Sequence, residues 1–169
     1  MVNLYGSTNS QEIMILLDLH EETTGRYEEV HEEQMSLAVT LAERFIDAGI
    51  PVGLLTNGVD IKMDQTFRLS AGTGKQQLEN INRGLSRIDL SKRTEVMKTI
   101  IREERDKLSH LQKTFIMISK NQRMDCYEEF LNLIHQGVNG FWIHTGYSGT
   151  ECTLPENRNI TFINWEVGR

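Results

Sequence analysis

The chain has 169 residues and a mass of 19.5 kDa, which is typical of a single domain. Its 18 lysines and arginines against 24 aspartates and glutamates give a formal net charge of −6. This balance argues against a nucleic-acid partner, because nucleic-acid binding requires clustered positive charge. No apolar run is long enough to span a membrane. The two cysteines, Cys126 and Cys152, are too few for a disulfide framework or a zinc site, so we expect a reducing, cytoplasmic setting.

Apolar segments alternate with amphipathic ones along the chain. The short apolar runs are typical of strands buried on both faces of a parallel sheet, and the periodic segments are typical of helices. We expect strands at 11–19, 51–57, 114–119, 140–145 and 159–165, an extended edge segment at 62–69, and helices at 27–48, 75–88, 93–108 and 124–136. The dipeptide Asn57-Gly58 is expected to close the second strand as a turn. This alternation predicts a single three-layer αβα Rossmann-like domain over residues 1–169 with a mostly parallel central sheet.

Ligands of such a sheet bind at the carboxyl ends of its strands. The first strand leads into Asp18, His20 and Glu22, which stand at alternate positions. If the chain stays extended there, the three side chains point the same way and converge on a cation, because each is a ligand type found on zinc or manganese. The competing interpretation is that Asp18 binds loop backbone while the other two side chains face water. Further loops expected at this edge are 56–58, 71–74, 119–122 and 145–149.

Two other chemistries have less support. The segment Gly72-Thr73-Gly74-Lys75 lacks the first glycine of a phosphate-binding Walker A loop, because Leu69 occupies that position. A helix-capping turn is therefore expected there. Cys126 lies in a predicted helix near its apolar face, which favours an inert core thiol over a nucleophile.

The order of these segments resembles a known family. A strand that ends in Asp18, a long helix, the segment Val52-Gly53-Leu54-Leu55-Thr56-Asn57-Gly58 and the segment 74–88 that follows it are similar to a von Willebrand factor A-type domain. More specifically, they resemble the carboxy-terminal region of the "domain of unknown function 58" family, over residues 2–145. The resemblance implies a von Willebrand A-like fold.

The resemblance also implies a cellular setting. Members of the family are membrane-anchored through amino-terminal transmembrane helices, and their carboxy-terminal domain lies at the cytoplasmic face of the cell membrane. We therefore expect the chain to be a domain excised from a longer membrane-anchored protein. The implied partner is a MoxR-type AAA+ ATPase, with the A-type domain as the interaction module.

Metal-binding A-type domains carry Asp-x-Ser-x-Ser after the first strand, a threonine in a later loop and an aspartate after the fourth strand. By this resemblance Asp18 matches the first aspartate, while His20 and Glu22 replace both serines. Thr73 corresponds to the threonine. The resemblance therefore implies a degenerate metal site at these four residues.

The loop after the fourth strand departs further from the family pattern. Ser119, Lys120 and Asn121 stand where Ser-Asp-Gly is expected, so that Lys120 replaces the last aspartate. A lysine ammonium there repels a divalent cation and is able to pair with Asp18. No cofactor is therefore expected. Binding of a divalent cation is kept as the alternative.

The sequence and the resemblance leave two candidate functions. The first is a non-catalytic protein-interaction domain of a membrane-associated protein. The alternative is a metal-dependent hydrolase that uses Asp18, His20 and Glu22. The first is favoured because the sequence offers no second acid–base pair for catalysis.

Overall fold

The computed structural model describes residues 11–19, 28–92, 95–107, 113–134 and 140–168. These residues form six strands and four helices. The strands are β1 (Glu12–Leu17), β2 (Val52–Asp60), β3 (Gln65–Gly72), β4 (Lys113–Ser119), β5 (Gly140–Gly146) and β6 (Ile160–Glu166). The helices are α1 (Glu28–Asp47), α2 (Gly74–Ser86), α3 (Met97–Asp106) and α4 (Met124–Ile134). Each predicted strand and helix is confirmed, with ends shifted by a few residues.

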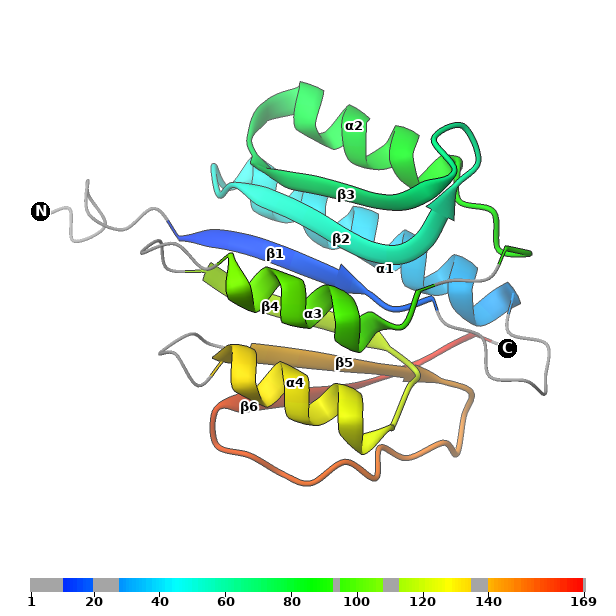
Figure 1. Ribbon diagram of the computed structural model, residues 1–169, viewed down its shortest axis with the longest axis vertical. Helices are drawn as coiled ribbons and strands as arrows, with labels where there is room; N and C mark the ends of the chain where they lie inside the picture. The colour runs from blue at the N-terminus through cyan, green and yellow to red at the C-terminus, as the bar shows by residue number, and fades with distance from the viewer. Residues whose placement is uncertain (1–10, 20–27, 93–94, 108–112, 135–139, 169) are drawn as a thin grey trace, which may run out of the picture.

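The six strands form one sheet in the order β3-β2-β1-β4-β5-β6 (Figure 1). All neighbouring strands are parallel except β2 and β3, which form an antiparallel pair at one edge. The central strand β1 is therefore flanked by β2 and β4, and the carboxyl ends of these three strands meet at one edge of the sheet. The expected mostly parallel sheet is confirmed.

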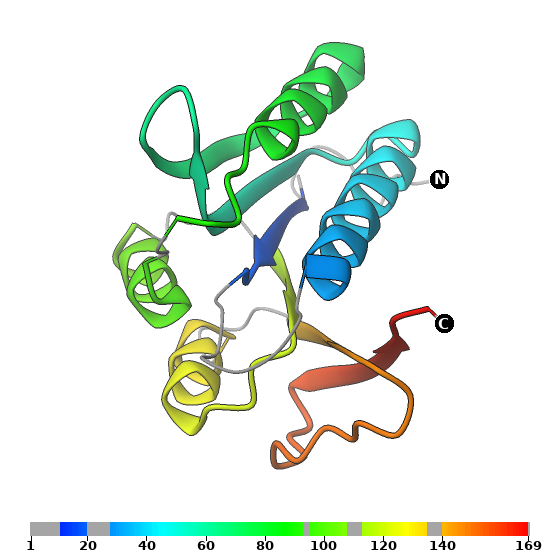
Figure 2. The same cartoon turned by 90° about the vertical axis from the view of Figure 1, so that its right-hand side faces the viewer.

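Helices cover both faces of the sheet, with α1 and α2 on one face and α3 and α4 on the other (Figure 2). Successive residues of β1 enter different halves of the core, because side chains of a strand alternate between faces. Ile15 and Leu17 pack with residues of α1 and α2, and Leu16 packs with residues of α3 and α4. All three are fully buried, and each contributes roughly 1.5–3 kcal/mol of hydrophobic stabilisation. The three-layer αβα architecture follows from this two-faced burial.

The predicted turn at Asn57-Gly58 is wrong, because β2 continues through both residues to Asp60. Gly58 is required there by packing: a Cβ on it would lie 2.9 Å from side-chain atoms of both Leu19 and Ile88. The chain instead reverses at residues 61–64. Asp60 holds this turn with Oδ1, which accepts the backbone N–H of Lys62 at 2.8 Å.

The antiparallel direction of β3 corrects a second expectation. Gln65 pairs with Asp60 at the carboxyl end of β2, and Gly72 pairs with Val52 at its amino end. The loop at 71–74, which was expected beside the other carboxyl-end loops, therefore lies at the opposite edge of the sheet. A hairpin reverses the chain, whereas a helical crossover would have kept β3 parallel.

Within the described ranges, no helix is both long and apolar enough to cross a bilayer.

Candidate functional site

A row of buried polar residues crosses four neighbouring strands near their carboxyl ends. Leu17 is in register with Thr56 on β2 and with Ile118 on β4, so the next residue, Asp18, lies beside Asn57 and Ser119. Ser119 is in turn in register with His144 on β5. We call Asn57, Asp18, Ser119 and His144 the polar row. None of the four is more than 4% exposed.

Asp18 is the centre of this row. Its Oδ1 accepts a hydrogen bond of 2.9 Å from Nδ2 of Asn57, and its Oδ2 accepts one of 2.8 Å from the hydroxyl of Ser119. A longer contact of 3.4 Å joins the same Oδ2 to Nδ2 of Asn121. Both carboxylate oxygens are thus held by donors from neighbouring strands and loops. A buried carboxylate needs such donors, because burying an unpaired charge is costly.

The partners of Asp18 are themselves fixed by the backbone. Oδ1 of Asn57 accepts the N–H of Leu19 at 2.7 Å, and the hydroxyl of Ser119 accepts the N–H of Asn121 at 2.9 Å. The carboxylate therefore joins the end of β1 to the end of β2 and to the loop after β4. These hydrogen bonds orient the chain that follows β1 and the loop that follows β4.

The predicted site residues have different outcomes. The structure brings Ser119 and Asn121 to Asp18, and half-buried Lys120 lies between them in the chain. Thr73 precedes α2 at the amino edge of the sheet, so it does not join the others. The other two predicted ligands, His20 and Glu22, lie outside the described residues. In the part of the chain that is described, no group of three or more His, Cys, Asp or Glu side chains is placed to hold a metal ion.

Cys126 lies near the row, at the start of α4, and it is almost fully buried. Burial raises the pKa of its thiol strongly, and the negative charge of Asp18 raises this pKa further. The reactive thiolate is therefore disfavoured. The prediction of an inert thiol agrees with this environment.

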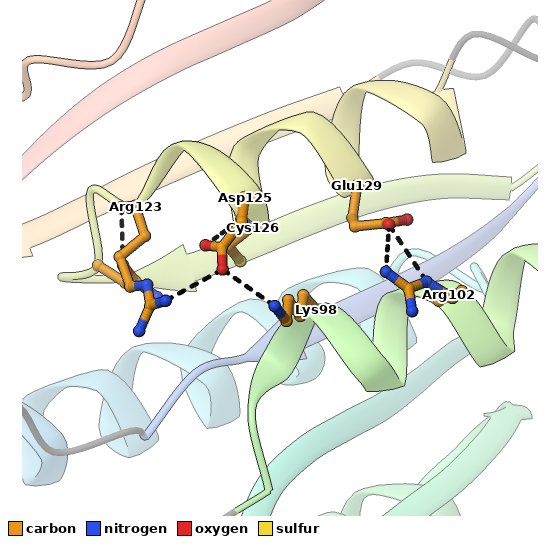
Figure 3. Close-up of polar contacts among 7 residues, drawn as sticks. Lys98, Arg102, Arg123, Asp125, Cys126 and Glu129 are labelled. Carbon is orange, nitrogen blue, oxygen red and sulfur yellow. Dashed lines mark hydrogen bonds and ion pairs between the residues drawn. The ribbon is translucent and has the colours of Figure 1, made fainter.

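Ion pairs beside Cys126 join α3 to α4 and the residue before α4 to its first turn (Figure 3). Lys98 and Arg123 both contact Oδ2 of Asp125, and Arg102 contacts Glu129 at 2.8 Å. The cavity next to the thiol has a volume of only about 10 Å³, about the space of one water molecule. A substrate has no room there.

Sequence reasoning missed His144. It placed Asn57 in the expected loop 56–58 at this edge, as part of a turn and without a role, whereas Asn57 lies inside β2 beside β1. His144 is buried, and its Nε2 has no hydrogen-bond partner among the described residues. Burial lowers the pKa of this imidazole. The signal that would have shown the role of both residues is strand order, because a 2-1-4-5 order places polar residues near the carboxyl ends of the four strands side by side.

A second buried polar contact lies at the same end of the molecule. Nε2 of Gln34 on α1 donates to the hydroxyl of Thr145 on β5 at 2.7 Å. Both residues are fully buried. This hydrogen bond joins α1 to β5. The side chains of Gln34 and Thr145 therefore help to hold the helix against the sheet.

Solved structures share this fold. An aerotolerance-related membrane protein from Bacteroides fragilis matches 87% of this chain over 77% of its own length, with a TM-score of 0.55 and 16% identity. The proximal thread matrix protein 1 of the mussel byssus matches 92% of this chain over 43% of its own length, with a TM-score of 0.56 and 13% identity. The pilus adhesin SpaC from Lactobacillus rhamnosus GG matches 82% of this chain over 24% of its own length, with a TM-score of 0.53 and 10% identity.

These identities are low, so the likeness concerns the fold alone. The chain therefore shares with these structures a three-layer, Rossmann-like αβα fold, with the strand order and the antiparallel edge strand described above. No protein-family model matches the sequence, and no curated protein matches it.

Proposed function

We propose that the chain is a non-catalytic, von Willebrand A-like interaction domain. The observation that carries this proposal is the state of Asp18. Its two carboxylate oxygens accept hydrogen bonds from Asn57 and Ser119 inside a buried row. A carboxylate that coordinates a metal or acts as a base must also present a lone pair to its ligand, and Asp18 is only 1% exposed.

The surrounding chemistry supports the same proposal. The buried thiol of Cys126 is protonated, and the cavity beside it is about the size of one water molecule. Ser119 donates its hydroxyl proton to Asp18, and among the described residues its hydroxyl has no hydrogen bond to the neighbouring imidazole of His144, the kind of base that activates a serine nucleophile. The described part of the edge is therefore better suited to holding loops in one arrangement than to catalysis.

We further propose that the chain belongs to the "domain of unknown function 58" family. In this account the chain is part of a membrane-anchored protein, lies at the cytoplasmic face of the cell membrane, and binds a MoxR-type AAA+ ATPase. The metal-dependent hydrolase that uses Asp18, His20 and Glu22 has no separate observation in its favour.

The test is direct binding to the purified MoxR-type ATPase. We would immobilise the chain and measure the association of the ATPase by biolayer interferometry, with ATP and with ADP. The proposal predicts saturable binding that depends on the nucleotide, because a remodelling ATPase changes its surface between nucleotide states. No binding in either nucleotide state would contradict the proposed partner. A metal-dependent release of phosphate from a phosphate ester would contradict the non-catalytic role.

A further inference from the structure

The turn between β2 and β3 presents two apolar side chains to solvent. Ile61 is 59% exposed and Met63 is 61% exposed, the largest exposed fractions among the large apolar residues that the structure describes. The turn lies at the carboxyl edge of the sheet, beyond the end of α2 (Figure 1). Large apolar side chains that stand out together on a surface often mark an interaction site.

The turn is held rigidly. Oδ1 of Asp60 accepts the N–H of Lys62 and of Met63, and Asp64 forms an ion pair of 2.6 Å with Lys92. The backbone N–H of Ile61 donates to the carbonyl oxygen of Arg87, which joins the turn to the end of α2. A rigid turn loses little conformational entropy when a partner binds, so its apolar side chains are pre-organised for contact.

Hollows of different charge lie on the two sides of the turn. The hollow on the Met63 side has a volume of about 560 Å³, and Phe67, Arg68 and Arg87 also line it. The hollow on the Ile61 side has a volume of about 410 Å³, and its lining includes Glu28, Glu32 and Asp89. The Ile61 side therefore has more acidic side chains, with Arg87 as its only cation among the lining residues, and the Met63 side has two arginines and one acidic residue, Asp60.

The charged residues of the two hollows differ in whether they already form ion pairs. Arg68 pairs with Glu95 and Glu103. Arg87, by contrast, has no carboxylate within ion-pair distance among the residues that the structure describes, although it lines both hollows. Glu28 and Glu32 likewise have no cationic partner within the described ranges.

We propose that this hairpin corner, defined as Ile61, Met63 and Arg87, is the surface through which the domain binds its protein partner. The partner segment carries apolar side chains that contact Ile61 and Met63, a carboxylate that pairs with Arg87, and a cationic group on the side of Glu28 and Glu32. Complementary charge of this kind fixes the orientation of a bound segment. A methionine at such a surface adapts its shape to the partner. This inference rests on the proposed function and names the surface that performs it.

The experiment uses the same binding assay with surface variants. The variant Ile61→Ser/Met63→Ser removes the apolar contacts, and Arg87→Glu reverses the charge, while Arg87→Lys keeps it. The matched control is Ile163→Ser/Trp165→Ser on β6, where the two residues are 40% and 39% exposed at the other edge of the sheet. Thermal unfolding of each variant checks that the fold is kept.

We expect the Ile61→Ser/Met63→Ser variant and Arg87→Glu each to weaken binding of the ATPase by about tenfold or more, as truncation of a central contact does. The control and Arg87→Lys should bind within about threefold of the unaltered protein. Equal binding of all variants would overturn the hairpin corner as the docking surface and leave the proposed function standing. If the unaltered protein fails to bind, the proposed function is overturned and this surface with it.

Discussion

Asn57 holds Asp18 and Leu19 at the same time. Its Nδ2 donates to the carboxylate of Asp18 at 2.9 Å, and its Oδ1 accepts the backbone N–H of Leu19 at 2.7 Å. One amide side chain of β2 therefore fixes the point at which β1 ends. The carboxyl edge of this domain depends on that double contact.

The first prediction removes this contact. Asn57→Ala leaves the carboxylate of Asp18 with one donor fewer and the N–H of Leu19 without its acceptor, both in buried positions. We expect the free energy of unfolding to fall by about 2–4 kcal/mol, because a buried group that loses its partner costs about 1–3 kcal/mol. Urea unfolding followed by circular dichroism measures this change.

The control for that prediction is Asn164→Ala, which changes an exposed asparagine on β6. It should alter stability by less than about 0.5 kcal/mol, as surface substitutions usually do. Equal effects of the two substitutions would show that the Asn57 contacts do not stabilise the fold.

The second prediction concerns the close approach of β3 to β2. A Cβ on Gly53 would lie 2.7 Å from the carbonyl oxygen of Leu69 and 2.8 Å from the backbone nitrogen of Ala71. Since both atoms belong to the backbone, Gly53→Ala forces the two strands apart, and we expect a loss of about 2 kcal/mol or more. Gly168→Ala serves as the control, because a Cβ at that position meets nothing within 4 Å. A Gly53→Ala protein as stable as this control would contradict the observed pairing of β2 with β3.

The third prediction is a pH dependence that arises from His144. Burial lowers the pKa of this imidazole in the folded protein, so the unfolded chain binds more protons once the pH falls below the ordinary histidine pKa of about 6.5. The contribution of neutral His144 to stability is therefore complete above about pH 7 and is lost as the pH decreases toward the lowered pKa.

Thermal unfolding between about pH 7.5 and pH 5.5 measures this loss as a decrease in the unfolding midpoint as the pH falls. The comparison is His144→Gln, whose side chain does not titrate and whose unfolding midpoint should change less over the same range. If the unfolding midpoints of the two proteins change identically with pH, the pKa of His144 does not differ between the folded and unfolded states.

The main features of the fold could be predicted from the sequence because the strands are continuous apolar runs. The run Ile13–Leu17 is buried on both sides of the sheet, and no amphipathic helix produces such a pattern. The direction of β3 could not be predicted in this way. Its residues are half-buried or exposed and form no continuous apolar run, and the hairpin turn at 61–64 lacks a strong turn dipeptide. The misplacement of Thr73 at the carboxyl edge follows from that single error.

The candidate site was predictable only in part. Asp18 and Ser119 could be placed together because each stands at the end of an apolar strand. The role of Asn57 could not be predicted, because the pair Asn57-Gly58 is also the strongest local signal for a turn. Only the packing of Leu19 and Ile88 around Gly58 shows why the strand continues. Local sequence preference was overridden by tertiary contact at this point.

The central claim is that Asp18 is a structural carboxylate and that the domain works without a bound metal. Thermal unfolding with and without Mg²⁺, Mn²⁺, Ca²⁺ and Zn²⁺ tests this claim most directly, on the unaltered protein and on Asp18→Asn. A cation at a hundred times its Kd would stabilise the fold by about 2.7 kcal/mol. We predict that no cation raises the midpoint of either protein, and that Asp18→Asn unfolds at a lower temperature under every condition. A rise with one of these cations that disappears in Asp18→Asn would contradict the claim and favour the hydrolase.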